Sequence, residues 1–514
     1  MKTKPIAAAA ALLIVLLVPT AGHSADALKL DVQEFTLYNG LTILLVERHQ
    51  VPTVSVCLTY RVGSADEPSG ITGIAHFIEH LYDKGTPMLG TTDPALEQTL
   101  IRQKDEVVAA LRAERRRQAP DPETIKTLEA RYAALKTQHD SIIVSGEIDK
   151  LFAEAGEAGK NATTFFDRTN YFISLPVNRF ELWCAVFSQI MRGPVFREFY
   201  EEQQVIIEER RMRVDNSPGG ALWEALLTAA YTGHPYHHPV LGWADDMANY
   251  TREQVMAFYT RYYAPNRAVL TIVGDLGAKD ALALIEQYFG DIPRQPPPDA
   301  RRTAEPAPRG EKTVTVEFDA QPRVYSSWLT VPLAHPDFVV FDVLSEIMSG
   351  GRTTRLYKRL VEKDQIAVGV WCWIMHLRDT NMFMYAATPK APHTVQEVDA
   401  AVLEEFERLK TEPVGARELE RAKNQLAAGF VRAMESNLDL AKVLGEYEVM
   451  VGWEFLRDYV AKTEAVTADD IQRVAREYLN RTNRTLAYIV PKKPAPPEQP
   501  GEAAGDTPTE ENAP

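Results

Sequence analysis

One helix–strand unit occurs twice in this sequence. The first copy begins at Thr251, a residue type that favours a helix N-terminus. It continues through a helix and an Asn-Arg pair to the apolar strand 268–273. The second copy begins at Thr467 and repeats this order, with one extra residue, to the strand 485–490. Chance does not readily match cap, helix, Asn-Arg pair and strand, so the sequence predicts a duplicated α+β domain.

The repeat divides the chain into segments. We expect a first domain at residues 28–290 and a second at 312–492, each with mainly antiparallel strands covered by helices. The segment 291–311 joins them, and its proline content is typical of a linker. Two long apolar helical stripes that turn at a proline-rich point predict a helical arm, residues 95–145, inserted in the first domain.

Both ends of the chain predict segments outside the folded domains. Lys2 and Lys4 precede the apolar run 6–18, which is too short to span a bilayer but suits the core of a cleaved signal peptide, residues 1–25. This predicts export to the periplasm, with no transmembrane segment in the mature chain; the alternative is an uncleaved anchor. The Pro-, Glu- and Gly-rich tail 493–514 predicts disorder.

Composition excludes some functions. A formal net charge of −15 argues against a nucleic-acid partner, because contact with phosphates requires a basic surface. The three cysteines cannot all pair with one another, and each lies among apolar neighbours. We therefore expect small buried side chains at Cys57, Cys184 and Cys372.

The pattern His-x-x-Glu-His at residues 76–80 predicts a metal site. His76 and His80 are four residues apart and project from the same side of a helix, with Glu79 beside them. Two neutral imidazoles one turn apart suit Zn²⁺, which also needs a third protein ligand and an open position. A neighbouring carboxylate can take a proton from water, as a metallopeptidase requires.

An ordinary structural role is the alternative for these histidines. Two histidines on a half-buried helix can be core or ion-paired residues without binding a metal. Histidine is scarce here, with 11 among 514 residues, so this spacing is seldom expected by chance.

Several further motifs extend this pattern. With them, the chain resembles the pitrilysin/insulinase family of zinc peptidases, in particular the bacterial two-domain branch related to mitochondrial processing peptidase. The matching motifs, spread over residues 30–492, are His76–His80 with Lys84-Gly85-Thr86, Asn161-Ala162-Thr163, Glu202 with Glu209, His234-Pro235-Tyr236, residues 263–266 and Ser349-Gly350-Gly351-Arg352.

The resemblance implies roles for individual residues. His76, His80 and Glu209 would hold Zn²⁺, and Glu79 would be the general base. Glu202, on the same predicted helix as Glu209 (residues 198–213), would orient a ligand histidine; its alternative is a surface charge. The strand at Asn161 would pair with an extended peptide substrate.

Two alternatives concern this site and its surroundings. Glu208, adjacent to Glu209, is a rival third ligand on helical-face grounds. The gap between His80 and Glu209 is longer than the family usually has, and the arm at 95–145 accounts for the excess. The resemblance also implies that the two domains face each other as a clam-shell.

The second domain departs from the family pattern. The family supplies there an Arg and, seven residues on, a Tyr that bind the substrate carbonyl; by register these positions are Val361 and Val368. Valine cannot donate a hydrogen bond, and loss of such donors costs on the order of 10²–10³ in rate. We therefore expect a homologous partner subunit that brings the missing pair; the alternative is that another residue substitutes.

The sequence thus predicts a zinc metalloendopeptidase that hydrolyses peptides or small unfolded polypeptides. Two alternatives stay open. One is a non-catalytic or weakly active zinc-binding scaffold subunit of a peptidase heterodimer. The other is a zinc-dependent module that captures peptides without cutting them.

Overall fold

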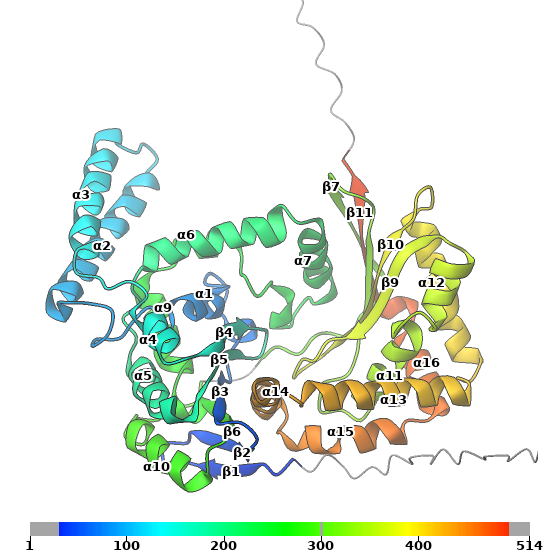
Figure 1. Cartoon of the computed structure of the whole chain (residues 1–514). Helices are drawn as coiled ribbons and strands as arrows, with labels where there is room; N and C mark the ends of the chain where they lie inside the picture. The colour runs from blue at the N-terminus through cyan, green and yellow to red at the C-terminus, as the bar shows by residue number, and fades with distance from the viewer. Residues whose placement is uncertain (1–29, 299–301, 493–514) are drawn as a thin grey trace, which may run out of the picture.

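A computed structural model of the chain describes residues 30–298 and 302–492 (Figure 1). The signal peptide expected at 1–25 and the disordered tail expected at 493–514 lie outside these residues. Within them, no helix combines the length and the apolar character needed to cross a bilayer. All three cysteines are buried and free.

The first sheet has six strands in the order β1-β2-β6-β3-β5-β4. Its only parallel pair is β2–β6. The strand β4 therefore forms one edge of this sheet. The strands are β1 (Gln33–Thr36), β2 (Thr42–Glu47), β3 (Thr53–Tyr60), β4 (Ala158–Thr164), β5 (Thr169–Pro176) and β6 (Ala268–Gly274).

The second sheet has five strands in the order β7-β11-β8-β10-β9. Its only parallel pair is β7–β11. Strand for strand, this repeats the order and directions of β2-β6-β3-β5-β4, so the expected fold class of two homologous α+β domains is confirmed. The strands are β7 (Lys312–Phe318), β8 (Val324–Leu329), β9 (Ala367–Ile374), β10 (Met382–Pro389) and β11 (Arg484–Pro491).

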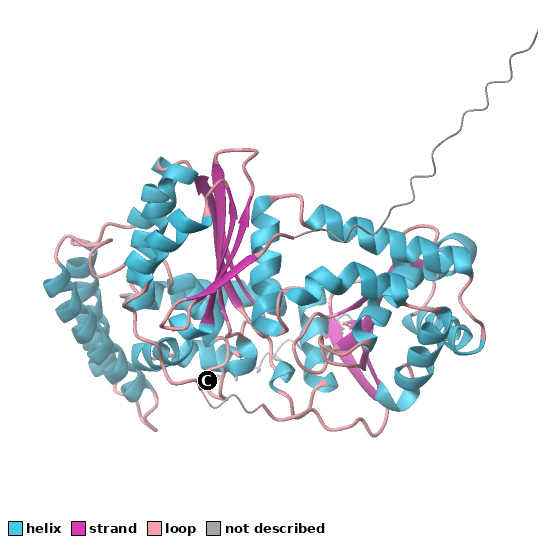
Figure 2. Cartoon of the chain, turned by 90° about the horizontal axis from the view of Figure 1, so that it is seen from below, coloured by secondary structure: helices cyan, strands magenta, loops and turns pink. Residues whose placement is uncertain are grey.

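Helices cover both sheets, and Figure 2 shows the first sheet nearly edge-on with helices on both faces. The α-helices described before the linker are α1 (Ile74–Leu81), α2 (Pro94–Arg115), α3 (Pro122–Asp140), α4 (Glu147–Glu154), α5 (Phe180–Arg192), α6 (Phe199–Arg210), α7 (Pro218–Ala230), α8 (Ala244–Asn249), α9 (Arg252–Tyr262) and α10 (Ala278–Phe289). Those after it are α11 (Asp337–Ser349), α12 (Val395–Thr411), α13 (Ala416–Ala433), α14 (Asn437–Met450), α15 (Glu454–Ala465) and α16 (Ala468–Tyr478).

The repeated sequence unit forms the same local structure twice. Thr251 caps α9, which leads into β6, and Thr467 caps α16, which leads into β11. Each threonine hydroxyl accepts from the backbone of the third helical residue, Gln254 or Asp470, whose side chain bonds back to the threonine N–H. These capping boxes stop the helix from extending backwards and fix its direction toward the strand.

The helices α2 and α3 form the expected arm, which projects away from the first sheet (Figure 1). Asp93 and Asp121 cap them, and each is followed by a proline in the first turn. The base of the arm is held by buried charges: the Arg197 guanidinium binds Glu97 of α2, and the His139 ring of α3 lies near the same carboxylate.

Each half of the chain, before and after the linker, places one helix on the sheet of the other half. The helix α7 follows the first half's α6 but packs on β7, β8 and β11 of the second sheet. In return, α14 packs on β3, β5 and β6 of the first sheet. One buried cluster therefore joins α7, through Leu222 and Leu226, to Met384 and Ile489 of the second sheet.

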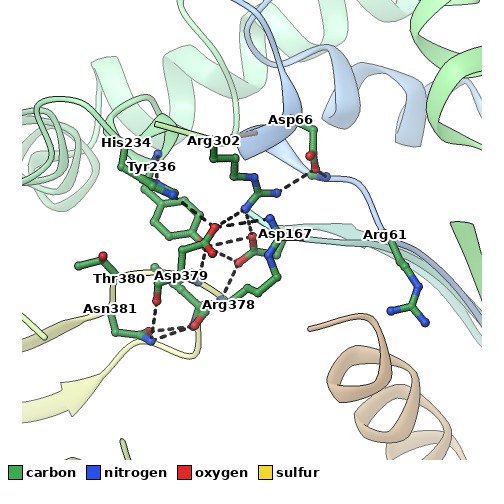
Figure 3. A network of polar contacts seen from close by, with 12 residues as sticks. Arg61, Asp66, Asp167, His234, Tyr236, Arg302, Arg378, Asp379, Thr380 and Asn381 are labelled. Carbon is green, nitrogen blue, oxygen red and sulfur yellow. Dashed lines mark hydrogen bonds and ion pairs between the residues drawn. The ribbon is translucent and has the colours of Figure 1, made fainter. Parts of the chain in front are cut away.

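The linker expected at 291–311 docks on both halves. The buried Arg302 guanidinium binds Asp66 and Asp167 of the first half and Asp379, at the β9–β10 turn of the second half (Figure 3). Three residues later, Glu305 accepts hydrogen bonds from the backbone N–H groups of residues 232–234. Its composition predicted a linker but not these contacts.

Prediction for the linker: Arg302→Met removes the one cation that all three carboxylates share. Breaking a buried ion pair and leaving its partner charged costs about 3–5 kcal/mol, so the melting temperature should fall clearly. Arg309→Met, at an exposed position of the same segment, is the control and should leave the melting temperature unchanged. Equal melting temperatures for both variants would contradict this role of Arg302.

Prediction for the helix exchange: Gly445→Val should destabilise the protein by about 1–3 kcal/mol, the usual cost of overpacking. A side chain at Gly445 of α14 would lie 2.6 Å from the Thr59 hydroxyl and 3.1 Å from that of Thr271, both in the first sheet. The matched control is Gly429→Val in α13, where the nearest atom is the flexible Arg432 guanidinium at 4.0 Å. Urea unfolding of both variants measures the difference, and no extra loss at position 445 would refute tight α14 packing.

Candidate metal centre

The site is built on α1, and a buried carboxylate fixes the start of that helix. Glu67 accepts hydrogen bonds from the backbone N–H groups of Gly73 (2.7 Å) and Ala75 (2.8 Å). These acceptor oxygens satisfy backbone donors that have no partner within the helix, and burial raises the pKa of Glu67. Gly73 has φ +86°, and a Cβ there would lie 2.3 Å from the Leu241 carbonyl oxygen, so only glycine fits this turn.

The apolar face of α1 orients its functional face. Ile74, Phe77, Ile78 and Leu81 are fully buried in the first half's core. The helix therefore cannot rotate, and it presents His76, Glu79 and His80 together. The two imidazole rings lie edge to face, with centroids 4.8 Å apart.

The helix α6 brings Glu209 to these two rings. The Glu209 Oε2 atom lies 3.5 Å from His76 Nε2 and 3.3 Å from His80 Nε2. Within the described residues, these three are the only His, Cys, Asp or Glu set whose possible ligand atoms all lie within 4.8 Å of one another. The structure thus brings together all three residues that the sequence predicted as ligands.

These three residues fit a tetrahedral metal. Zinc bonds of about 2.0–2.1 Å at the tetrahedral angle separate two ligand atoms by about 3.3–3.4 Å, close to the separations found here. Oε2 of Glu209 is also buried without a hydrogen-bond partner. A buried carboxylate oxygen left without a donor is costly, and a cation between the three groups would satisfy it.

Glu202 lies behind His80, one helical repeat before Glu209. Its Oε2 atom accepts from His80 Nδ1 at 3.2 Å, and its Oε1 atom lies 2.6 Å from Lys84 Nζ. Donation from Nδ1 leaves the lone pair of His80 on Nε2, the atom that faces Glu209. Burial disfavours the charged form of His80, but the nearby carboxylates of Glu202 and Glu209 outweigh this and raise its pKa to about 9, so a metal that binds Nε2 must displace a proton.

His76 is held in the neutral form. Burial, with the neighbouring His80 charge, lowers its pKa to about 4. Its Nδ1 atom is buried without a hydrogen-bond partner. An uncharged imidazole is the form that binds a metal.

Glu79 lies beside this cluster, against the strand β4. Burial raises its pKa, against a hydrogen bond donated by the Thr164 hydroxyl of β4. A buried carboxylate with a raised pKa is a suitable proton acceptor near neutral pH. On the same edge strand, Asn161 is exposed.

Other predicted positions lie apart from the cluster. The Glu208 side chain is 58% exposed and pairs with Arg211, so it does not compete with Glu209, which is 12% exposed. Val361 is half-buried in the helical segment Tyr357–Lys363, and Val368 is 63% exposed on β9. Neither offers a donor.

The sequence analysis missed two contributors, Glu67 and Arg213. Arg213 Nη2 lies 2.9 Å from Glu209 Oε1. It belongs to a π-helical turn, Arg211–Asp215, that continues α6, whereas an uninterrupted α-helix had been expected over 198–213. The spacing of four residues from Glu209 was the available signal for Arg213.

Prediction for the cluster: Glu202→Gln keeps the size of the side chain but removes the charge that orients His80. Loss of such a supporting carboxylate costs about 10–100-fold in metal affinity. Zinc affinity measured by chelator competition should fall accordingly, while Glu208→Gln, on the exposed face of α6, should bind zinc as the parent does. Unchanged affinity in Glu202→Gln would assign Glu202 a surface role only.

Comparison with known proteins agrees with this geometry. The family model described as "Insulinase (Peptidase family M16)" matches residues 42–99 and 138–243. The "Peptidase M16 inactive domain" model matches residues 249–426. The gap in the first match, residues 100–137, falls within the arm formed by α2 and α3.

Similar proteins include named zinc proteases. The zinc protease PqqE of Helicobacter pylori is 28% identical over 472 residues, covering 89% of this chain and 93% of that protein. A probable mitochondrial-processing peptidase subunit beta of Schizosaccharomyces pombe is 24% identical and covers 86% of this chain and 88% of its own length.

Solved structures agree in fold. The crystal structure of a protease from Helicobacter pylori has a TM-score of 0.75 at 27% identity, covering 90% of this chain and 99% of that chain. The periplasmic protease PqqL from Escherichia coli shares the fold with a TM-score of 0.65 at 17% identity. That match covers 89% of this chain but 47% of the longer PqqL chain.

Proposed function

Because this chain belongs to the insulinase family, peptidase family M16, we propose that it is a zinc metalloendopeptidase acting on peptides or small unfolded polypeptides in the periplasm. The observation that carries the proposal is the convergence of His76, His80 and Glu209, at ligand separations that suit zinc, beside the buried carboxylate of Glu79. Residues 28–290 are the proposed catalytic domain and 312–492 the proposed inactive domain.

Zinc, Glu79 and Glu202 have separate roles in the proposed hydrolysis. When bound, zinc acts as a Lewis acid that polarises the scissile carbonyl and makes water more acidic. Glu79 takes the proton from the attacking water and delivers it to the leaving amine. Glu202 holds His80 in the tautomer that leaves Nε2 free to bind.

The edge strand β4 is the proposed peptide-binding element. It contacts α1, and Thr164 of β4 donates to Glu79, so a strand paired with β4 passes beside the base. It lies at the edge of the sheet, and Asn161 is exposed there. An added strand gains main-chain hydrogen bonds whatever its sequence, which suits unfolded substrates.

A homologous partner subunit is proposed to complete the site. The two positions where the family places an Arg and a Tyr are Val361 and Val368, neither of which can bind a substrate oxygen. The fold likeness to PqqL spans less than half of that longer chain, which leaves room there for a second such unit. The alternative function, a weakly active zinc-binding scaffold subunit, rests on the same two valines.

Prediction for the function: Glu79→Gln should retain stoichiometric zinc but lower kcat/KM for an unfolded peptide by about 10²–10⁴-fold, the usual contribution of general acid–base catalysis. Elemental analysis and a quenched fluorescent peptide measure the two properties. The control is Glu154→Gln, at a position 67% exposed on α4, which should cleave normally.

Three outcomes separate the possibilities. Cleavage by the parent chain, alone or with the product of a homologous gene, supports the peptidase. Full activity in Glu79→Gln discards the assigned base. Zinc binding without cleavage in either preparation supports the scaffold alternative.

A further inference from the structure

The strongest feature that the proposed function leaves unused is the cation beside the third ligand. Arg213 lies four residues after Glu209, in the π-helical turn Arg211–Asp215. Such turns are often found at functional sites. The inference drawn from it rests on the proposed zinc site.

The two oxygens of Glu209 have separate surroundings. Oε2 faces His76 and His80 at 3.5 and 3.3 Å and has no hydrogen-bond partner. Oε1 faces away and binds Arg213 Nη2 at 2.9 Å. The guanidinium thus occupies one oxygen and leaves the other for a single metal bond.

The backbone of Arg213 is fixed by the start of α7. A Cβ atom at Gly220 would lie 1.8 Å from the Arg213 carbonyl oxygen, so α7 crosses this turn at a distance that only glycine allows. The Arg213 backbone therefore has a defined position although its side chain is 68% exposed. Since α7 is anchored in the second sheet, this position depends on both halves.

Because the Arg213 side chain is exposed, its effect on metal binding can be measured separately from any effect on folding stability. An exposed ion pair contributes little to folding stability, so loss of Arg213 should not unfold the protein. A glutamate side chain without such a partner samples several rotamers, and ordering it on metal binding costs conformational entropy. A partner that fixes the rotamer beforehand lowers that cost.

We propose that Arg213 is a positioning residue for zinc: it binds Glu209 Oε1 and thereby holds Oε2 toward His76 and His80. It touches neither substrate nor metal in this role. Its effect should appear in metal affinity and coordination before it appears in any rate.

The test compares three variants of the full chain. Arg213→Met keeps the length of the side chain but removes the charge and the donors, and Arg213→Lys keeps the charge. Arg211→Met is the matched control, because Arg211 lies in the same turn and pairs with the exposed Glu208. Zinc affinity is measured by chelator competition, and the visible spectrum of the Co²⁺-substituted protein reports coordination geometry.

We expect Arg213→Met to bind zinc about 10–100-fold more weakly, with an altered Co²⁺ spectrum and an unchanged melting temperature of the metal-free protein. Arg213→Lys should recover part of the affinity, and Arg211→Met all of it. Parental affinity and spectrum in Arg213→Met would overturn the proposal while leaving the zinc site intact. Failure of the parent chain to bind stoichiometric zinc would instead overturn the proposed function, and with it this inference.

Discussion

The exchange of α7 and α14 between the two halves is the constraint on which the site depends. The helix α6 carries Glu202 and Glu209, and the chain continues through the Arg211–Asp215 turn into α7, which is buried against the second sheet. Figure 1 shows α6 and α7 joined in this way above the gap between the halves. Glu209, the proposed third ligand, therefore takes its position from packing in a domain that supplies none of the proposed ligands.

Local sequence patterns predicted much of this arrangement. The helix carrying His76, Glu79 and His80 could be predicted because its ligands, apolar face and stop signal all lie within a dozen residues. The duplicated helix–strand unit predicted two related domains, and the sheet order bears this out. Glu202 and Glu209 were placed by family resemblance, and their seven-residue spacing explains why both face α1.

Other features left no local signal. The apolar faces of α7 and α14 look the same whichever sheet they cover, so the exchange could not be predicted from periodicity. Glu67 binds the start of α1 from an irregular loop, where no pattern distinguishes it from a solvated glutamate. The composition around Arg302 indicated a linker, but its three carboxylate partners come from distant turns.

The two repeats differ at the positions where the first carries the proposed site. In equivalent places after β3 and β8, α1 presents two histidines and a glutamate, whereas α11 is almost wholly buried, with apolar residues such as Phe341 and Leu344. The equivalent edge strands differ as well: β4 exposes Asn161, and β9 exposes Val368 and Trp371. Polar groups at a sheet edge suit a hydrated peptide backbone, whereas exposed apolar groups there favour contact with another surface. The second repeat thus has the features of a support that fixes Glu209 through α7.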